Sequence, residues 1–142
     1  MKMYMLIKTA MVSSALIVVA GCSEYGDFTT EQICKASLAV IKGKSPTMMM
    51  TDKVVKEEET GLDVFYISYP RPDDNNKWHV RCKVNKKRAI WAQNEGRWRD
   101  QAQDPTIRFV INDDEIEINE MYPDGSAAKK VTFNISMLGG RT

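Results

Sequence analysis

The feature that most constrains the fold is an alternation of apolar and polar residues that begins near Leu62 and continues toward the C-terminus. A side-chain period of two is typical of β-strands with one buried and one solvated face. Turn-forming residues separate the alternating segments, as in an antiparallel meander. The predicted strands are Leu62–Tyr69, Lys77–Val84, Arg88–Gln93, Thr106–Asn112, Glu115–Tyr122 and Lys130–Met137. The faces expected to be buried include Trp78, Val80, Cys82 and Val84, and later Val131, Phe133, Ile135 and Met137.

One helix is predicted ahead of these strands, over residues 29–42. Thr29 and Gln32 fit a capping box, and Gly43 fits the position just past a helix end. A single apolar stripe includes Ile33, Cys34, Leu38 and Ile41. Residues 45–61 are ambiguous, although the charged segment 53–59 is compatible with a weak edge strand. The expected fold class is α+β: one N-terminal helix packed on an antiparallel β-meander of five to seven strands.

The first 21 residues have the character of an export signal. Lys2 and Lys8 provide the positive start, and the segment 9–20 is almost entirely small or apolar. This apolar run is shorter than the roughly 20 residues that a membrane-spanning helix needs. A short N-terminal membrane helix is the alternative, and it is disfavoured because no apolar run continues past Gly21.

The end of this segment, Val19-Ala20-Gly21-Cys22, resembles the lipobox of bacterial lipoproteins. The resemblance covers residues 1–22 only, and it implies cleavage before Cys22 and acylation of that residue. Two or more acyl chains hold a protein firmly on a membrane. We therefore expect 22–28 to be the lipidated cysteine with a short polar tether, and 29–142 to be one domain. Ser23, rather than Asp, implies by the same resemblance an outer-membrane location facing the periplasm.

The cysteine count is consistent with this resemblance. The chain has three cysteines, and lipidation of Cys22 leaves Cys34 and Cys82 in an oxidising compartment, where disulfides persist. Cys34 lies on the apolar stripe of the helix, and Cys82 lies on the expected inner face of the sheet. A disulfide between them is therefore predicted to join the two layers.

Several function classes are disfavoured by composition. Cleavage before Cys22 removes Lys2 and Lys8, so the 20 basic residues of the chain fall to 18 against 19 acidic ones. A net charge near −1 disfavours nucleic acid as a partner. The single histidine and two oxidised cysteines are too few for a zinc site, and no metal or other cofactor is predicted. No catalytic constellation is evident, so the chain is not expected to be an enzyme.

The segment 77–99 is the most distinctive part of the expected domain. It carries eight basic residues against one acid, Glu95, together with all three tryptophans. Arginine and tryptophan are favoured at binding hot spots. The candidate partner-binding residues are His79, Arg81, Arg97, Trp98 and Arg99. The alternative is that Trp78 and Trp91 fill the core while the basic side chains balance an acidic hairpin at 113–120.

Three hypotheses follow for the function. The first is a membrane-anchored, non-catalytic module that binds another envelope component, most simply a protein. The second is an inhibitor, immunity or exclusion lipoprotein that blocks an incoming enzyme, toxin or phage component. The third and least favoured is an enzyme acting on wall or lipid material, which would need two convergent carboxylates.

Overall fold

The computed structural model describes residues 24–142, so the signal segment and Cys22 lie outside the described residues. One α-helix precedes seven strands, with a short 3₁₀ helix before the first strand and another after the last. The helices are α1 (Thr30–Lys42), η1 (Pro46–Met48) and η2 (Ile135–Leu138). The strands are β1 (Met50–Lys56), β2 (Asp63–Pro70), β3 (Lys77–Asn85), β4 (Arg88–Gln93), β5 (Thr106–Asn112), β6 (Glu115–Met121) and β7 (Ala127–Asn134).

Helix α1 begins and ends where its capping residues require. The Thr29 hydroxyl accepts a hydrogen bond from the Gln32 backbone amide at 3.1 Å, and the Gln32 side chain accepts one from the Thr29 amide at 3.0 Å. Gly43 adopts a left-handed conformation with φ of 63°, which a residue with a side chain seldom takes at a helix end. The predicted capping box and C-terminal glycine are therefore confirmed.

The sheet is an uninterrupted antiparallel meander in the order β1-β2-β3-β4-β5-β6-β7. The predicted α+β class is confirmed, with seven strands at the upper end of the expected range. Strand β1 is an edge strand that includes only residues 53–56 of the charged segment 53–59, and its register shifts between Thr51 and Lys53. Exposed lysines and a bulge on an edge strand are features that discourage pairing with another chain.

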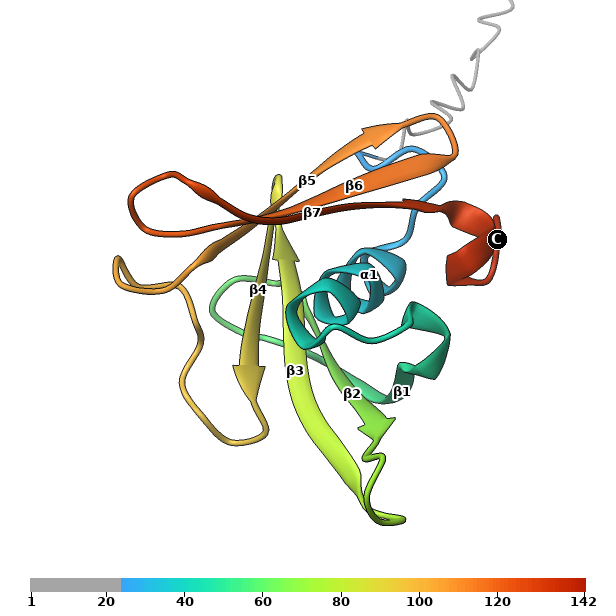
Figure 1. Cartoon of the computed structure of the whole chain (residues 1–142), viewed down its shortest axis with the longest axis vertical. Helices are drawn as coiled ribbons and strands as arrows, with labels where there is room; N and C mark the ends of the chain where they lie inside the picture. Colours follow the sequence, from blue (N-terminus) through green and yellow to red (C-terminus); the bar gives the residue numbers. More distant parts are fainter. Residues whose placement is uncertain (1–23) are drawn as a thin grey trace, which may run out of the picture.

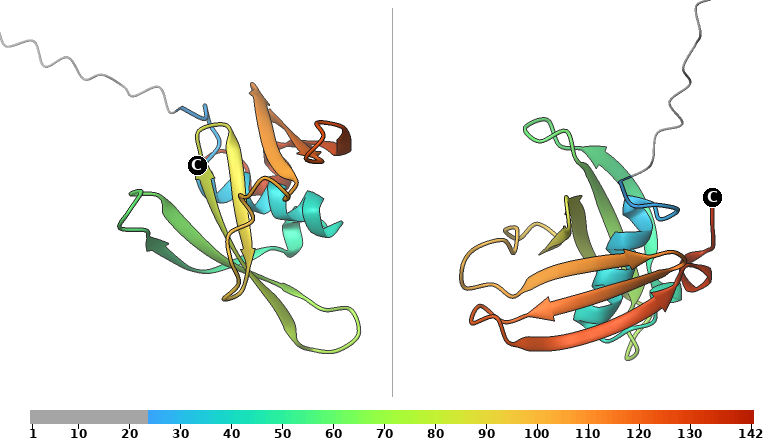
Figure 2. Two further views of the ribbon diagram at one scale, coloured as in Figure 1. Left: turned by 90° about the vertical axis from the view of Figure 1, so that its left-hand side faces the viewer. Right: turned by 90° about the horizontal axis from the view of Figure 1, so that it is seen from above.

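The sheet twists so strongly that it wraps around α1. Strands β4 and β5 pair only at Arg88 with Arg108 and at Ala89 with Ile107, so the sheet splays at this junction. Figure 1 shows β2–β4 crossing β5–β7 at a steep angle, with α1 in the angle between them, and Figure 2 shows β5–β7 lying across the helix. The core therefore fills the concave side of the sheet and consists mainly of aliphatic and aromatic side chains from α1 and from β2–β7.

A disulfide joins the helix to the centre of the sheet. The Cα atoms of Cys34 in α1 and Cys82 in β3 are 5.8 Å apart, and both residues are fully buried. The predicted pairing is thus present in the structure.

Two predictions about the apolar faces are wrong in part. The last strand is Ala127–Asn134 rather than Lys130–Met137, because the Asn134 side chain accepts a hydrogen bond from the Ser136 amide and starts the 3₁₀ helix η2. Phe133 and Ile135 are buried as expected, but Val131 and Met137 are exposed. Trp78 lies 42% exposed in the β2–β3 hairpin, where the guanidinium of Arg71 covers its ring at 4.4 Å.

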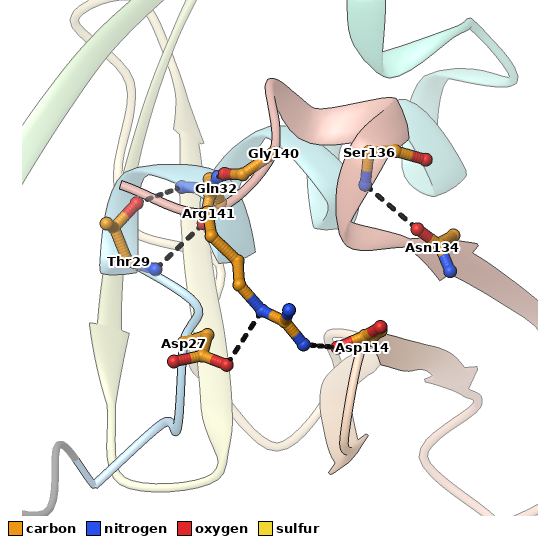
Figure 3. A network of polar contacts seen from close by, with 8 residues as sticks. All are labelled: Asp27, Thr29, Gln32, Asp114, Asn134, Ser136, Gly140 and Arg141. Carbon is orange, nitrogen blue, oxygen red and sulfur yellow. Dashed lines mark hydrogen bonds and ion pairs between the residues drawn. The ribbon is translucent and has the colours of Figure 1, made fainter.

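The segment expected to be a tether is instead held against the domain from Tyr25 onward. Phe28 is buried in the core, and the ring centres of Tyr25 and Phe109 are 5.6 Å apart. The Arg141 guanidinium bonds to Asp27 and to Asp114, and so links this segment to the β5–β6 turn (Figure 3). Within residues 24–142, no helix is both long enough and apolar enough to cross a bilayer.

Candidate functional site

The convex side of β1–β3 carries polar and aromatic side chains in rows that follow the strand register. Lys53 pairs with Tyr66, and Tyr66 pairs with Arg81, so one row crosses three strands. In the neighbouring row, Ser68 of β2 pairs with His79 of β3. The Lys53 ammonium lies 4.3 Å from the centre of the Tyr66 ring, within the range of a cation–π interaction. These rows form a continuous face, which we call the outer face.

An open pocket of about 620 Å³ lies on the outer face. Its wall combines side chains from β1, β2 and β3 with the turn that follows β4. The pocket is lined by Asp52, Lys53, Tyr66, Ile67, His79, Val80, Arg81, Asn94 and Glu95. Both signs of charge are present around an aromatic ring, so the pocket offers hydrogen-bond donors, acceptors and an apolar surface to one ligand.

Asp52 and His79 of the pocket lie beside Ser68, and these three residues have the side-chain types of a serine hydrolase but not its geometry. The Ser68 hydroxyl donates a hydrogen bond to Asp52 Oδ1 at 3.1 Å, and His79 Nδ1 lies 3.8 Å from Asp52 Oδ2. In a catalytic triad the histidine stands between the serine and the carboxylate and removes the serine proton. Here the carboxylate stands in the middle, and Ser68 is only 1% exposed. This arrangement does not activate Ser68 as a nucleophile.

Trp98 is half-buried and covers the basic end of the outer face. The centre of its indole ring lies 4.6 Å from Arg81 Cζ and 4.2 Å from Lys83 Nζ. Arg81 also donates a hydrogen bond to the Gly96 carbonyl, which holds the turn after β4 against the strand. Trp98 and Arg81 therefore fix each other, and their exposed atoms form a rigid edge beside the pocket.

The other two predicted arginines lie apart from this face. Arg97 makes two hydrogen bonds, of 2.7 and 2.9 Å, to the buried carboxylate of Asp104. These bonds and one from the Gln101 amide lower the pKa of Asp104 to about 2. Arg97 thus anchors the connection between β4 and β5.

Arg99 belongs to a cluster at the end of α1. Its Cζ lies 5.7 Å from the centre of the Trp91 ring, and the Lys42 ammonium lies 4.3 Å from the same ring. Burial, and secondarily the charge of Arg99, lowers the pKa of Lys42. Trp91 packs at the margin of the core, as the alternative interpretation of the tryptophans expected, whereas Trp78 is exposed. Within residues 24–142, no ion pair joins the basic segment 77–99 directly to the acidic hairpin at 113–120.

The structure thus brings together His79, Arg81 and Trp98, and it adds residues that the sequence did not single out. Asp52, Lys53 and Tyr66 join the site through the pairing of β1 with β2. Within residues 24–142, no group of His, Cys, Asp and Glu side chains is arranged to hold a metal ion.

No protein-family model matches the chain, and no curated protein or solved structure shows significant similarity to it.

Proposed function

We propose that this protein is a lipid-anchored, non-catalytic binding module of the bacterial cell envelope, and that it contacts a protein partner through the outer face. The observation that carries the proposal is the open pocket of about 620 Å³ between Lys53, Tyr66 and Arg81, bordered by Trp98. Binding hot spots favour such aromatic and arginine side chains when neighbouring contacts hold them in place. Ordered side chains also lose little conformational entropy when a partner docks.

The charge of the pocket favours a protein over a polyanion. Asp52 and Glu95 face the same space as Lys53 and Arg81, so acidic and basic groups of a partner both find complements there. A nucleic acid would instead require a surface on which positive charge dominates. Electrostatic complementarity of this mixed kind favours specificity for one partner surface.

The anchor is the second part of the proposal. Cys22 is inferred to carry acyl chains that hold the domain on a membrane, with the outer membrane as the expected site. Intact-mass and peptide mass spectrometry of the protein from its own cells tests this directly. The expected N-terminal peptide begins at Cys22 and carries diacylglycerol and an additional acyl mass. A peptide that contains an intact Met1 would rule out the anchor.

Site-specific photo-crosslinking in intact cells tests the outer face. A photoreactive amino acid at position 53 should yield a defined protein adduct, whereas the same probe at position 132, exposed on β7, should not. The substitutions Tyr66→Ala and His79→Gln should abolish the adduct formed from position 53. Lys130→Gln, on a side chain 65% exposed and remote from the pocket, is the matched control.

The identity of the adduct separates the two binding hypotheses. A resident envelope protein supports the module proposed here, and a component of an incoming toxin or phage supports the inhibitor. An adduct that survives both pocket substitutions would show that the outer face is not the binding surface.

A further inference from the structure

A second cationic feature lies outside the outer-face pocket, at the junction of β4 and β5. Arg88 and Arg108 are direct cross-strand partners, in one of only two residue pairs that join these strands. Like charges placed directly opposite each other destabilise a sheet. The repulsion between the two arginine charges therefore needs a compensating partner.

The described residues 24–142 provide no compensating partner for the side chains of Arg88 and Arg108. Of the seven arginines in 24–142, five have a carboxylate, a carbonyl or an aromatic ring as partner. Within the same residues, the side chains of Arg88 and Arg108 make no hydrogen bond, ion pair or ring contact. The Nε of Arg88 is in addition buried without an acceptor. A buried donor that belongs to a charged group is costly to leave unsatisfied, and such donors commonly face a water or an ion.

A pocket of about 280 Å³ is lined by both Arg88 and Arg108. Gln101, Thr106 and Tyr122 also line it and add neutral hydrogen-bonding groups. Two carboxylates lie in the same wall. Asp104 is neutralised by its two bonds to Arg97, so Asp100 is the remaining negative charge against the two arginines.

We infer that Arg88 and Arg108 form a binding site for a phosphate group, which accepts hydrogen bonds from both guanidinium groups at once. Guanidinium forks match phosphate oxygens in bidentate geometry, and an oxyanion between two of them converts their repulsion into attraction. A phosphate has enough oxygens to serve both forks and a neutral donor such as the Thr106 hydroxyl, whereas a carboxylate has only two. The site is separate from the proposed partner-binding pocket and does not depend on the anchor.

Phosphate binding by the full chain, purified in a neutral detergent, tests this inference. Isothermal titration with inorganic phosphate, at constant ionic strength in chloride, should show binding that saturates below about 10 mM. Arg88→Gln and Arg108→Gln should each weaken it by about tenfold or more, because each removes charge-assisted bonds. Arg71→Gln, at the β2–β3 hairpin, is the control and should leave it unchanged.

Thermal unfolding tests whether weaker phosphate binding by a variant results only from loss of the fold. In phosphate-free buffer, Arg108→Gln should melt at the same temperature as the parent chain or higher, since it removes repulsion across the strand pair. Added phosphate should raise the melting temperature of the parent chain and not that of the variant. No phosphate binding by the parent chain, or binding by either glutamine variant that is as tight as that of the parent chain, overturns the inference.

Two soluble ligands distinguish the possible sources of the phosphate group. Dibutyryl phosphatidic acid carries a terminal phosphate, and dibutyryl phosphatidylcholine is its matched control with a blocked one. Tighter binding of the phosphatidic acid than of inorganic phosphate assigns the site to a lipid headgroup. Equal or weaker binding assigns it to free phosphate or to a small phosphorylated molecule.

Discussion

The ammonium group of Lys83 lies 3.1 Å from both carboxylate oxygens of Glu57 and directly beneath the indole ring of Trp98. Lys83 is on the outer face of β3 yet is only 8% exposed, because Glu57 and Trp98 cover it. The pKa of Glu57 is lowered by its hydrogen bonds from Thr60 and then from Lys83. The Lys83–Glu57 ion pair thus lies at one side of the outer face, where Lys83 packs against Trp98 beside the pocket.

Substitution of Glu57 should destabilise the fold. Glu57→Gln leaves the buried ammonium of Lys83 without its counter-charge, and we expect the free energy of unfolding to fall by about 1–2 kcal/mol. Urea denaturation monitored by tryptophan fluorescence measures this. Glu58→Gln, on the exposed neighbour, should have almost no effect. Equal midpoints for the two variants would show that Glu57 contributes nothing to stability.

The Cys34–Cys82 crosslink should supply a large part of the stability. It closes a loop with a sequence separation of 48 residues, for which chain-entropy reasoning gives about 4 kcal/mol. Urea denaturation of the parent chain with and without reductant isolates the crosslink, because both sulfurs remain in place. A Cys34→Ala/Cys82→Ala chain should be insensitive to the reductant. An unchanged midpoint in reduced parent protein would contradict this prediction.

The Arg97–Asp104 pair should give stability a distinct dependence on pH. The pKa of Asp104 falls from an ordinary 3.8 to about 2 in the folded chain, so the carboxylate favours folding once it is ionised. This contribution is complete above about pH 4 and is lost as the pH falls toward 2. Asp104→Asn should therefore be less stable than the parent at pH 7 and should approach it near pH 2. Urea denaturation across this range measures the difference, and a constant difference would show that another group is responsible.

Lys129 should stabilise the end of helix α1. Its ammonium lies 3.1 Å from the carbonyl oxygen of Val40, which also accepts a hydrogen bond from the Gly43 amide, and 3.5 Å from the carbonyl oxygen of Ile41. Lys129→Met should lower the free energy of unfolding by about 1 kcal/mol. The adjacent Lys130→Met is a matched control on the same strand, because Lys130 makes only a solvated contact of 3.7 Å with Glu117. Lys130→Met should lower the free energy of unfolding by about 0.5 kcal/mol or less. Thermal unfolding of both variants gives the comparison.

Local patterns were sufficient to predict α1 and strands β2–β6 to within about two residues, because capping residues and a period of two are properties of neighbouring positions. The end of β7 was not predictable in this way. Alternation continues through Ile135 and Met137, but the hydrogen bond from the Ser136 amide to Asn134 redirects the chain. Trp78 was assigned to the correct side of its strand, but it lies in a hairpin where the buried layer ends.

His79 and Arg81 of the candidate site were predicted from a single strand, and Trp98 was predicted from the composition of the segment 77–99. Alternation alone places His79 and Arg81 on one face of β3. The contributions of Lys53 and Tyr66 depend on how β1 pairs with β2, and this pairing includes a register shift that no local pattern specifies. The roles of Arg97 and Arg99 depend on how the connection after β4 folds back, where the Arg99 amide bonds to the Trp91 carbonyl at 2.8 Å.

The clamp formed by the C-terminal tail has a mechanical consequence. Arg141 holds Asp27 against the β5–β6 turn (Figure 3). The Gln32 side chain donates hydrogen bonds to the carbonyls of Leu138 and Gly140. In the proposed lipid-anchored form, Ser23 and the exposed Glu24 would follow the acylated Cys22 before the first packed side chain, that of Tyr25. A pulling force on the anchor would therefore reach Asp27 and pass through Arg141 to the β5–β6 turn and the C-terminal tail.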